Sequence, residues 1–331
     1  MMKRRKFLFA LALSGFAVPP DSFAQQQGKV WRIGILAASS RPASPDSHYA
    51  LGSFLKAMRE LGWIEGKNVS YEWRWAEGKY ERLPGLAAEL VQLKPDVIVA
   101  ATPPSIQAAR QATASIPIVM VAVGDPVALG FVASFARPGG NVTGVSNAVD
   151  DVSNKYLELL RSVVPRLKRV AALVNPDNPN YLKILGQIQA AAKTIAVDIA
   201  TIEAKTPDQI AAGIGGLKRL RADALIVQAD GFFGSQWRHI AELALKHRMP
   251  TMFWTREPVE AGGLMSYGQN VADDYRKTAT FVNRILKGAS PRDLPVEQPT
   301  ILKLTINRKT ARALGLTLPQ ELLLRANEVI E

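Results

Sequence analysis

The stretch DVIVAATPPSIQAARQATASIPIVMVAV, residues 96–123, decides the fold of this chain. It begins with a continuous apolar segment (96–101), continues through a proline-led segment of helical character (104–113) and ends in a second apolar segment (116–123). Short strands that are apolar on both faces and separated by a helix are typical of a parallel sheet covered by helices on both sides. The stretch therefore predicts a strand–helix–strand unit of an α/β domain.

The same alternation extends in both directions from this unit. Upstream, strands are expected at residues 30–36 and 69–75, and residues 152–254 repeat the alternation of helices and strands downstream. A length of 331 residues suits about two domains. We therefore predict an α/β protein with two Rossmann-like lobes, each built on a parallel sheet.

The boundaries of the lobes follow from counting strands. The first unit supplies only four strands, whereas a doubly wound lobe usually has about five, so we expect the chain to return to it. We predict a signal peptide at 1–24, an N-terminal lobe of 25–143 with 268–299, and a C-terminal lobe of 144–267. Residues 300–331 are expected to cross back near the hinge, since several crossings between lobes form a hinge.

The N-terminus has the three parts of an export signal. A basic start, with Lys3 to Lys6, precedes an apolar run from 7 to 18 and a small-x-small pattern that ends at Ala24. The apolar run is shorter than the ~20 residues of a spanning helix. We expect cleavage after Ala24 and a periplasmic location; Arg4-Arg5 leaves the ordinary and the twin-arginine routes open, and an uncleaved anchor is the alternative.

The composition excludes several kinds of site. The chain has no cysteine, so it has neither disulfides nor thiolate metal ligands, and its three histidines lack metal-ligand spacing. It has no G-x-G-x-x-G, P-loop or G-x-S-x-G motif, so we expect no cofactor and no catalytic set. The net charge is +12, but the basic residues are scattered, which predicts no nucleic-acid partner.

Polar loops follow the predicted strands, where ligands of parallel α/β sheets bind. The loop at Thr102–Ser105 opens a helix, and Thr102 is suited to cap it. Free N–H groups there would favour an anion such as a carboxylate, although an ordinary helix cap without a ligand is the alternative. In the second lobe, Asp230 could bind an ammonium group of the ligand or cap the following helix. The aromatic side chains of Phe232, Phe233 and Trp254 could line the ligand site or pack in the core.

Three further sequence motifs resemble those of a known protein family. They are GDPVALG at 124–130, RPGGNVTG at 137–144 and NPDNP at 175–179. Together with the export signal, they resemble the ABC-transporter substrate-binding family that includes tryptophan- and tyrosine-binding members. The resemblance covers nearly all of the mature chain. It implies the type I periplasmic-binding fold, with a hinge of about three crossovers, and no catalysis.

The resemblance also implies ligand capture in the cleft by loops of both lobes. Carried over by motif position, the ligand-binding residues are Ser39, Ser40, Thr102, Pro103, Ser105, Asp125, Asp177, Asn178, Asp230 and Tyr267.

The leading hypothesis is a monomeric solute-binding component of an ABC importer. It would bind a small-molecule ligand, an amino acid or small carboxylate, and dock on an ABC permease in the inner membrane. An exported sensor that presents its ligand to a membrane receptor remains an alternative that the sequence does not separate. An exported enzyme with Asp125 or Asp230 as general base is the third hypothesis.

Overall fold

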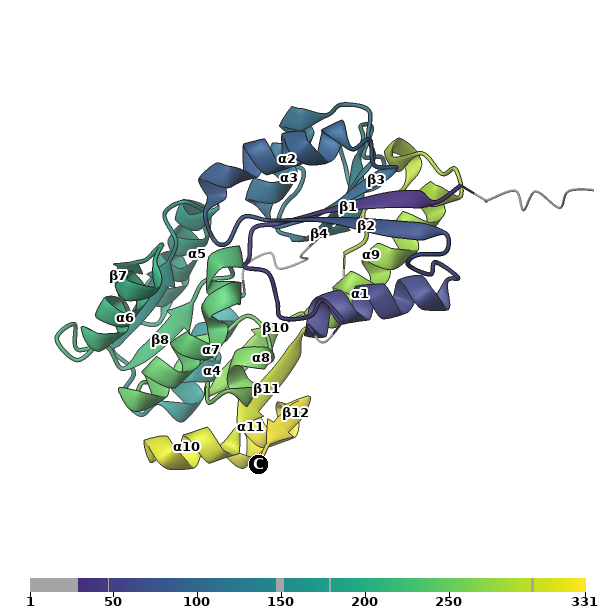
Figure 1. The fold of residues 1–331 in the computed structure, drawn as a ribbon. Helices are drawn as coiled ribbons and strands as arrows, with labels where there is room; N and C mark the ends of the chain where they lie inside the picture. The colour runs from purple at the N-terminus through teal and green to yellow at the C-terminus, as the bar shows by residue number, and fades with distance from the viewer. Residues whose placement is uncertain (1–28, 47, 147–151, 179, 299–300) are drawn as a thin grey trace, which may run out of the picture.

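Two α/β lobes, each built around one sheet, make up the protein in a computed structural model (Figure 1). The structure describes residues 29–46, 48–146, 152–178, 180–298 and 301–331, so the predicted signal peptide lies outside the described residues. Within this part of the chain, no helix is both long and apolar enough to cross a bilayer. The predicted fold class, an α/β protein with two lobes that are each built on a mostly parallel sheet, is confirmed.

The first sheet is entirely parallel and has the order β2-β1-β3-β4-β5. Its strands are β1 (Trp31–Ala37), β2 (Val69–Trp75), β3 (Val97–Ala101), β4 (Ile118–Val123) and β5 (Val142–Ser146). The quoted stretch forms β3, α3 (Pro103–Ala112) and β4 as predicted. Strand β5 runs over the predicted boundary at residue 143 and completes the sheet.

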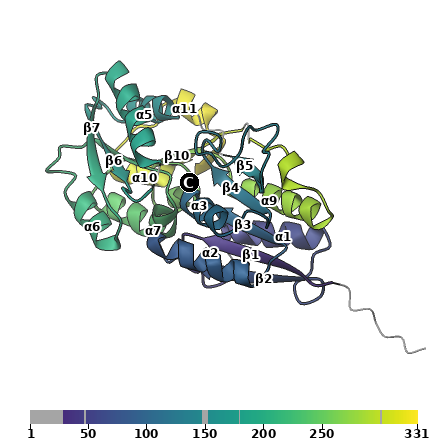
Figure 2. The same ribbon diagram turned by 90° about the horizontal axis from the view of Figure 1, so that it is seen from above.

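Helices cover both faces of this sheet because its strands alternate their apolar side chains between two cores. Helices α1 (Tyr49–Glu60) and α9 (Val271–Leu286) pack on the face that contains Ile33 and Val99. Helices α2 (Leu83–Gln92) and α3 pack on the opposite face. Figures 1 and 2 show α9, which comes late in the sequence, beside α1.

The second sheet has the order β12-β11-β10-β9-β8-β6-β7. Its strands are β6 (Arg169–Val174), β7 (Asp198–Glu203), β8 (Ala224–Val227), β9 (Thr251–Phe253), β10 (Met265–Gly268), β11 (Lys303–Asn307) and β12 (Glu328–Ile330). All neighbours pair in parallel except β10 and β11. Strands β11 and β12 come from the predicted C-terminal segment 300–331 and extend this sheet.

Helices on both faces of the second sheet bury two further cores. Helices α4 (Ser153–Val163) and α5 (Tyr181–Thr194) lie over one face, and α6 (Pro207–Gly215) and α7 (Gly231–Lys246) over the other. The short helices are α8 (Glu257–Glu260), α10 (Arg308–Leu314) and α11 (Gln320–Arg325). Phe233 is fully buried in the second of these cores, together with Phe232.

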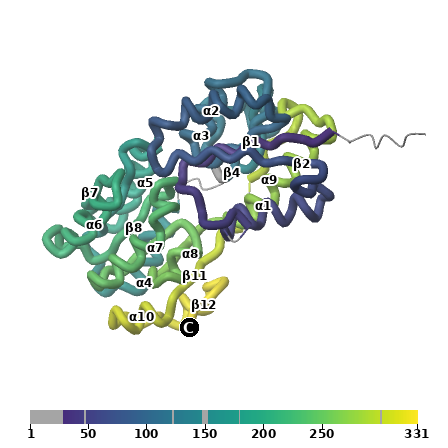
Figure 3. Tube along the Cα trace, in the orientation of Figure 1, coloured from purple at the N-terminus to yellow at the C-terminus, as the bar shows by residue number. Residues whose placement is uncertain are grey.

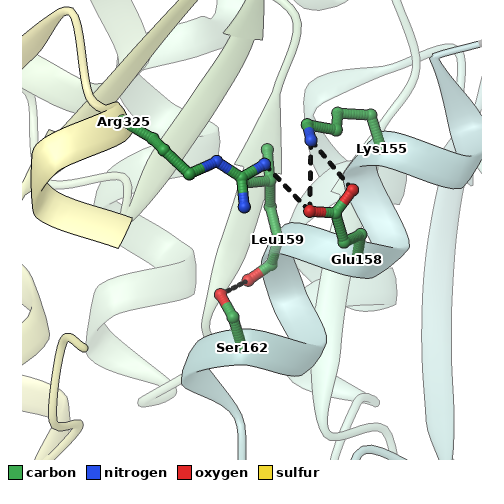
Figure 4. A network of polar contacts seen from close by, with 5 residues as sticks. All are labelled: Lys155, Glu158, Leu159, Ser162 and Arg325. Atoms are coloured by element: carbon green, nitrogen blue, oxygen red, sulfur yellow. Dashed lines mark hydrogen bonds and ion pairs between the residues drawn. The ribbon is translucent and has the colours of Figure 1, made fainter. Parts of the chain in front are cut away.

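A polar cluster on the surface joins the C-terminal end of the chain to α4. The carboxylate of Glu158 accepts hydrogen bonds from Lys155 Nζ at 2.8 Å and from Arg325 of α11 at 2.9 Å (Figure 4). The bonds from Lys155 and then Arg325 lower the pKa of Glu158 below its ordinary value. Because these groups are largely exposed, the cluster fixes the position of α11 more than it adds stability.

The chain passes from one lobe to the other three times, which is the predicted number of crossings (Figure 3). They lie between β5 and α4, between β10 and α9, and between residue 297 and β11. Before the last passage, the chain runs along β5, where Thr143 Oγ1 donates to the carbonyl of Leu294 at 2.7 Å and Val145 pairs with Glu297.

The glycine that ends the RPGGNVTG phrase is required by the close approach of β4 and β5. Gly144 has φ +136°, and a Cβ at this position would lie 2.2 Å from the carbonyl oxygen of Met120.

We expect Gly144→Ala to lower the free energy of unfolding by more than about 2 kcal/mol, measured by urea denaturation. Gly186→Ala is the control, because this exposed position on α5 has open space and alanine favours a helix. Equal stability of the two variants would contradict this account.

Candidate functional site

A cavity of about 300 Å³ lies between the lobes, at the carboxyl ends of both sheets. The first lobe lines it with the loops after β1, β3 and β4 and with the start of α1. The second lobe lines it with the loops after β6, β8 and β9 and with α4 and α5. In parallel sheets, strand ends and helix N-termini converge at one edge, so this is the position that the topology favours for a ligand.

The structure brings six of the ten predicted site residues to this cavity. The six that line it are Ser39, Thr102, Pro103, Asp125, Asn178 and Asp230.

The other four predicted residues lie outside the lining. Ser40 is half-buried beside Ser39, and Ser105 is fully buried beneath Thr102. Asp177 is half-exposed and pairs with Lys205 at 3.5 Å. The ring of Tyr267 packs against the core between the second sheet and α4.

Thr102 does not cap α3 as the sequence suggested. It stands at the N-cap position with φ +86°, which is rare for a non-glycine residue, and its side chain accepts no helix N–H. Its hydroxyl instead lies 3.2 Å from Ser105 Oγ. Since Pro103 and Pro104 have no N–H, this helix start offers an anion fewer backbone donors than expected. Strain of this kind is common at ligand sites.

The carboxylate of Asp230 is the most connected polar group of the site. Its Oδ1 accepts from the backbone N–H groups of Phe232 and Phe233 and from Asn175 Nδ2, at 2.9, 3.2 and 3.1 Å. Its Oδ2 accepts from Asn178 Nδ2 at 2.8 Å and from the Tyr80 hydroxyl at 2.9 Å. Asp230 therefore caps α7, which is one of its two predicted roles, and its oxygens are occupied without a ligand.

Tyr80 reaches Asp230 from the opposite lobe. It belongs to a short 3₁₀ turn (Tyr80–Arg82) that precedes α2 in the first lobe. Burial, followed by the nearby charge of Asp230, raises the pKa of Tyr80 far above its ordinary value. The phenol therefore stays protonated and remains a hydrogen-bond donor across the cleft.

Two further contacts join the lobes at the cavity. Asp125 Oδ2, after β4, lies 3.7 Å from Lys183 Nζ on α5. Gly231 packs so close to Thr102 that an added Cβ would lie 3.0 Å from the methyl group of Thr102. Together with the Tyr80–Asp230 bond, these contacts describe a closed arrangement of the lobes.

Aromatic side chains form much of the wall, and the sequence pointed to only one of them, Trp254. The others come from both lobes and from α9, which begins at the hinge: Tyr49, Trp75, Tyr156 and Tyr275. Trp75 stacks on Trp73 with the ring centroids 5.6 Å apart. Tyr49, Tyr156 and Tyr275 belong to three different helices. In each helix, the spacing of apolar residues indicates a buried face, but it does not tell whether that face borders the core or a cavity.

Gln228 is a further cavity residue that is not among the ten predicted site residues. It directly follows β8 and lines the cavity. Its position after a buried strand was the available signal, as for Asp230 two residues later. Among the described residues, no group of three or more His, Cys, Asp or Glu side chains could hold a metal ion.

Comparison with known proteins agrees with this architecture. The family model described as "ABC transporter substrate binding protein" matches residues 33–330. A protein named tyrosine-binding protein, from Clostridioides difficile (strain R20291), is 28% identical over 272 residues, which cover 82% of this chain and 78% of that protein.

Two solved structures bear on the arrangement of the lobes. A Streptococcus pneumoniae ABC domain in complex with L-Trp is 27% identical, with a TM-score of 0.81 over 91% of this chain and 99% of that chain. A ligand-free, open substrate-binding protein from Clostridium difficile is 29% identical, with a TM-score of 0.62 over 91% and 99%. The TM-score is higher for the structure solved with L-Trp than for the one described as ligand-free and open.

The bond between Tyr80 and Asp230 should stabilise the closed arrangement. Removing it with Tyr80→Phe should cost about 1 kcal/mol and raise the ratio of open to closed molecules roughly fivefold. The chain has no native cysteine. Spin labels on Val127→Cys and Leu182→Cys, exposed positions of the first and second lobe, therefore report the distance across the cleft.

Tyr71→Phe is the matched control, because Tyr71 packs within the first lobe. Identical distance distributions for Tyr80→Phe, Tyr71→Phe and the parent would show that the bond does not stabilise closure.

Proposed function

This chain belongs to the family of ABC transporter substrate-binding proteins, and on that premise we propose that it is the extracytoplasmic solute-binding component of an importer. It captures one small molecule between its lobes, closes over it by movement at the hinge, and delivers it to a permease in the membrane. Export by the predicted signal peptide, with cleavage after Ala24, fits this role.

The observation that carries the proposal is the cavity between the two lobes. Its volume of about 300 Å³ is at the lower end of the range for small-molecule sites, which suits a ligand the size of an amino acid. Both lobes contribute to the wall, so a bound ligand contacts both only when the cleft is closed. Such a ligand has a higher affinity for the closed state and shifts the population toward it.

An amino acid with a sizeable apolar or aromatic side chain is the ligand class that the wall favours. Trp75 and Tyr49 from the first lobe, with Tyr156 and Trp254 from the second, offer flat apolar surfaces with polar edges. Relatives are named for tyrosine binding and solved with L-Trp. The hydroxyls of Ser39 and Thr102 lie at the cavity and would bind the main-chain groups of such a ligand.

Binding without chemical turnover is part of the proposal. The two carboxylates that could act as bases in the cavity are both engaged. Asp230 is saturated by five donors. Asp125 accepts two backbone N–H groups and faces Lys183.

A thermal-shift screen of the mature protein, starting at Gln25, tests the ligand class. A ligand present at a hundred times its Kd adds about 2.7 kcal/mol of stability, which should raise the Tm by several degrees. We expect a shift with at least one L-amino acid and none with sugars at the same concentration. A shift with sugars alone would reject the amino-acid class and leave the binding role intact.

Adjacent serines provide a matched test of the site. Ser39 lines the cavity and Ser40 does not. We expect Ser39→Ala and Thr102→Ala each to weaken binding of the ligand from the screen about tenfold, about 1.4 kcal/mol, by calorimetric titration. Ser40→Ala should bind like the parent. If all three variants bind equally, the ligand does not contact the first-lobe loops.

A further inference from the structure

Gln228 is one of the residues that line the cavity, and neither polar atom of its buried amide has a partner among the described residues. Only 2% of the residue is exposed, and both Nε2 and Oε1 lack a hydrogen bond. Buried polar groups of proteins are nearly always paired, because an unpaired donor or acceptor loses its hydration without compensation. An unpaired amide in the wall of a ligand cavity therefore indicates a partner on the ligand.

The surroundings of Gln228 are apolar. Gln228 lies two residues after Ile226, so the pleat directs both side chains to the same side of the sheet. On that side, Ile226 packs with Tyr156 of α4 and Ile188 of α5. These three residues line the cavity together with Gln228. The second-lobe end of the cavity thus combines this apolar wall with the buried, unpaired amide of Gln228.

No charged side chain of the lining is free to compensate a charge on the ligand at this end. Asp230 has five donors for its two oxygens, which offer about four lone-pair sites. Lys183 and Asp125 face each other across the cleft mouth. Burial lowers the pKa of His48, so its imidazole is neutral near pH 7. A buried, uncompensated charge is strongly unfavourable.

We infer that Gln228 is the specificity-determining residue of the cavity, and that it binds an uncharged group of the ligand that carries both a hydrogen-bond donor and an acceptor. A phenol and a carboxamide both have this chemistry. The inference rests on the proposed function, in which the ligand is an amino acid. The side chain of the ligand then enters the second-lobe end, and its charged main-chain groups stay near Ser39 and Thr102.

Two pairs of probe ligands test this recognition. L-Tyrosine and L-phenylalanine differ by the phenol hydroxyl, and L-glutamine and L-methionine differ by the carboxamide. By calorimetric titration, we expect the parent to bind the polar member of one pair at least tenfold more tightly than its apolar counterpart, and the pair that shows this identifies the group. Gln228→Met, a near-isostere without the amide, should reduce that ratio to about one.

Gln189→Met provides the matched control, since it makes the same substitution at an exposed position of α5 outside the lining. It should keep the parental ratio. A purely structural role of Gln228 would lower the Tm of the ligand-free protein, whereas the recognition role predicts an unchanged or higher Tm for Gln228→Met.

The outcomes separate the inference from the proposed function. If the parent binds an amino acid without preferring the polar member of either pair, the inference is overturned while the proposed function stands. The same holds if Gln228→Met keeps the parental ratio or weakens both members of the pair equally. If no L-amino acid binds to the parent at all, the proposed ligand class fails, and the inference fails with it.

Discussion

The buried carboxylate of Asp230 is the interaction on which the site depends. It caps α7 through two backbone N–H groups and fixes the amides of Asn175 and Asn178 after β6. A buried carboxylate is tolerated only when hydrogen bonds replace its hydration, and here the protein supplies them all. The loops after β6 and β8 are therefore held in one geometry before any ligand arrives. Such pre-organisation lowers the entropy that binding would otherwise cost.

The same group connects this rigid loop cluster to the movable part of the molecule. Tyr80 contributes the one donor to Asp230 that comes from the first lobe, and water can take its place when the cleft opens. The ion pair of Asp125 with Lys183 is largely exposed and adds little stability. In the proposed capture mechanism, contacts of this kind would leave the open and closed states close in free energy, so that a ligand of moderate affinity would shift the balance.

Much of the fold could be predicted because its signals are local. Apolar strands, such as 97–101 and 118–123, alternate with helices, and their order implies parallel sheets. The antiparallel pairing of β10 with β11 has no such signal, since it joins segments separated by α9. The loops of the site were predictable for the same topological reason, as Ser39, Thr102, Asp125, Asn178 and Asp230 follow strands.

The missed residues depend on three-dimensional packing. The periodicity of α4 places Tyr156 on the buried face, but only the second lobe as a whole decides that this face borders a cavity. Gln228 belongs to no motif, and what distinguishes it is the lack of a partner, a property that no sequence pattern encodes. Thr102 was expected to cap α3, but its positive φ directs its hydroxyl to Ser105 instead.

The position of α9 has a consequence for the order in which the protein is synthesised and folds. Phe281 and Val282 of this helix fill the core beside Ile33 and Val97, which are translated about 250 and about 185 residues earlier. Until α9 is made, α1 alone covers this face of the first sheet. The first lobe therefore completes its core only after most of the second lobe has been translated, so the two lobes do not mature as independent units in chain order.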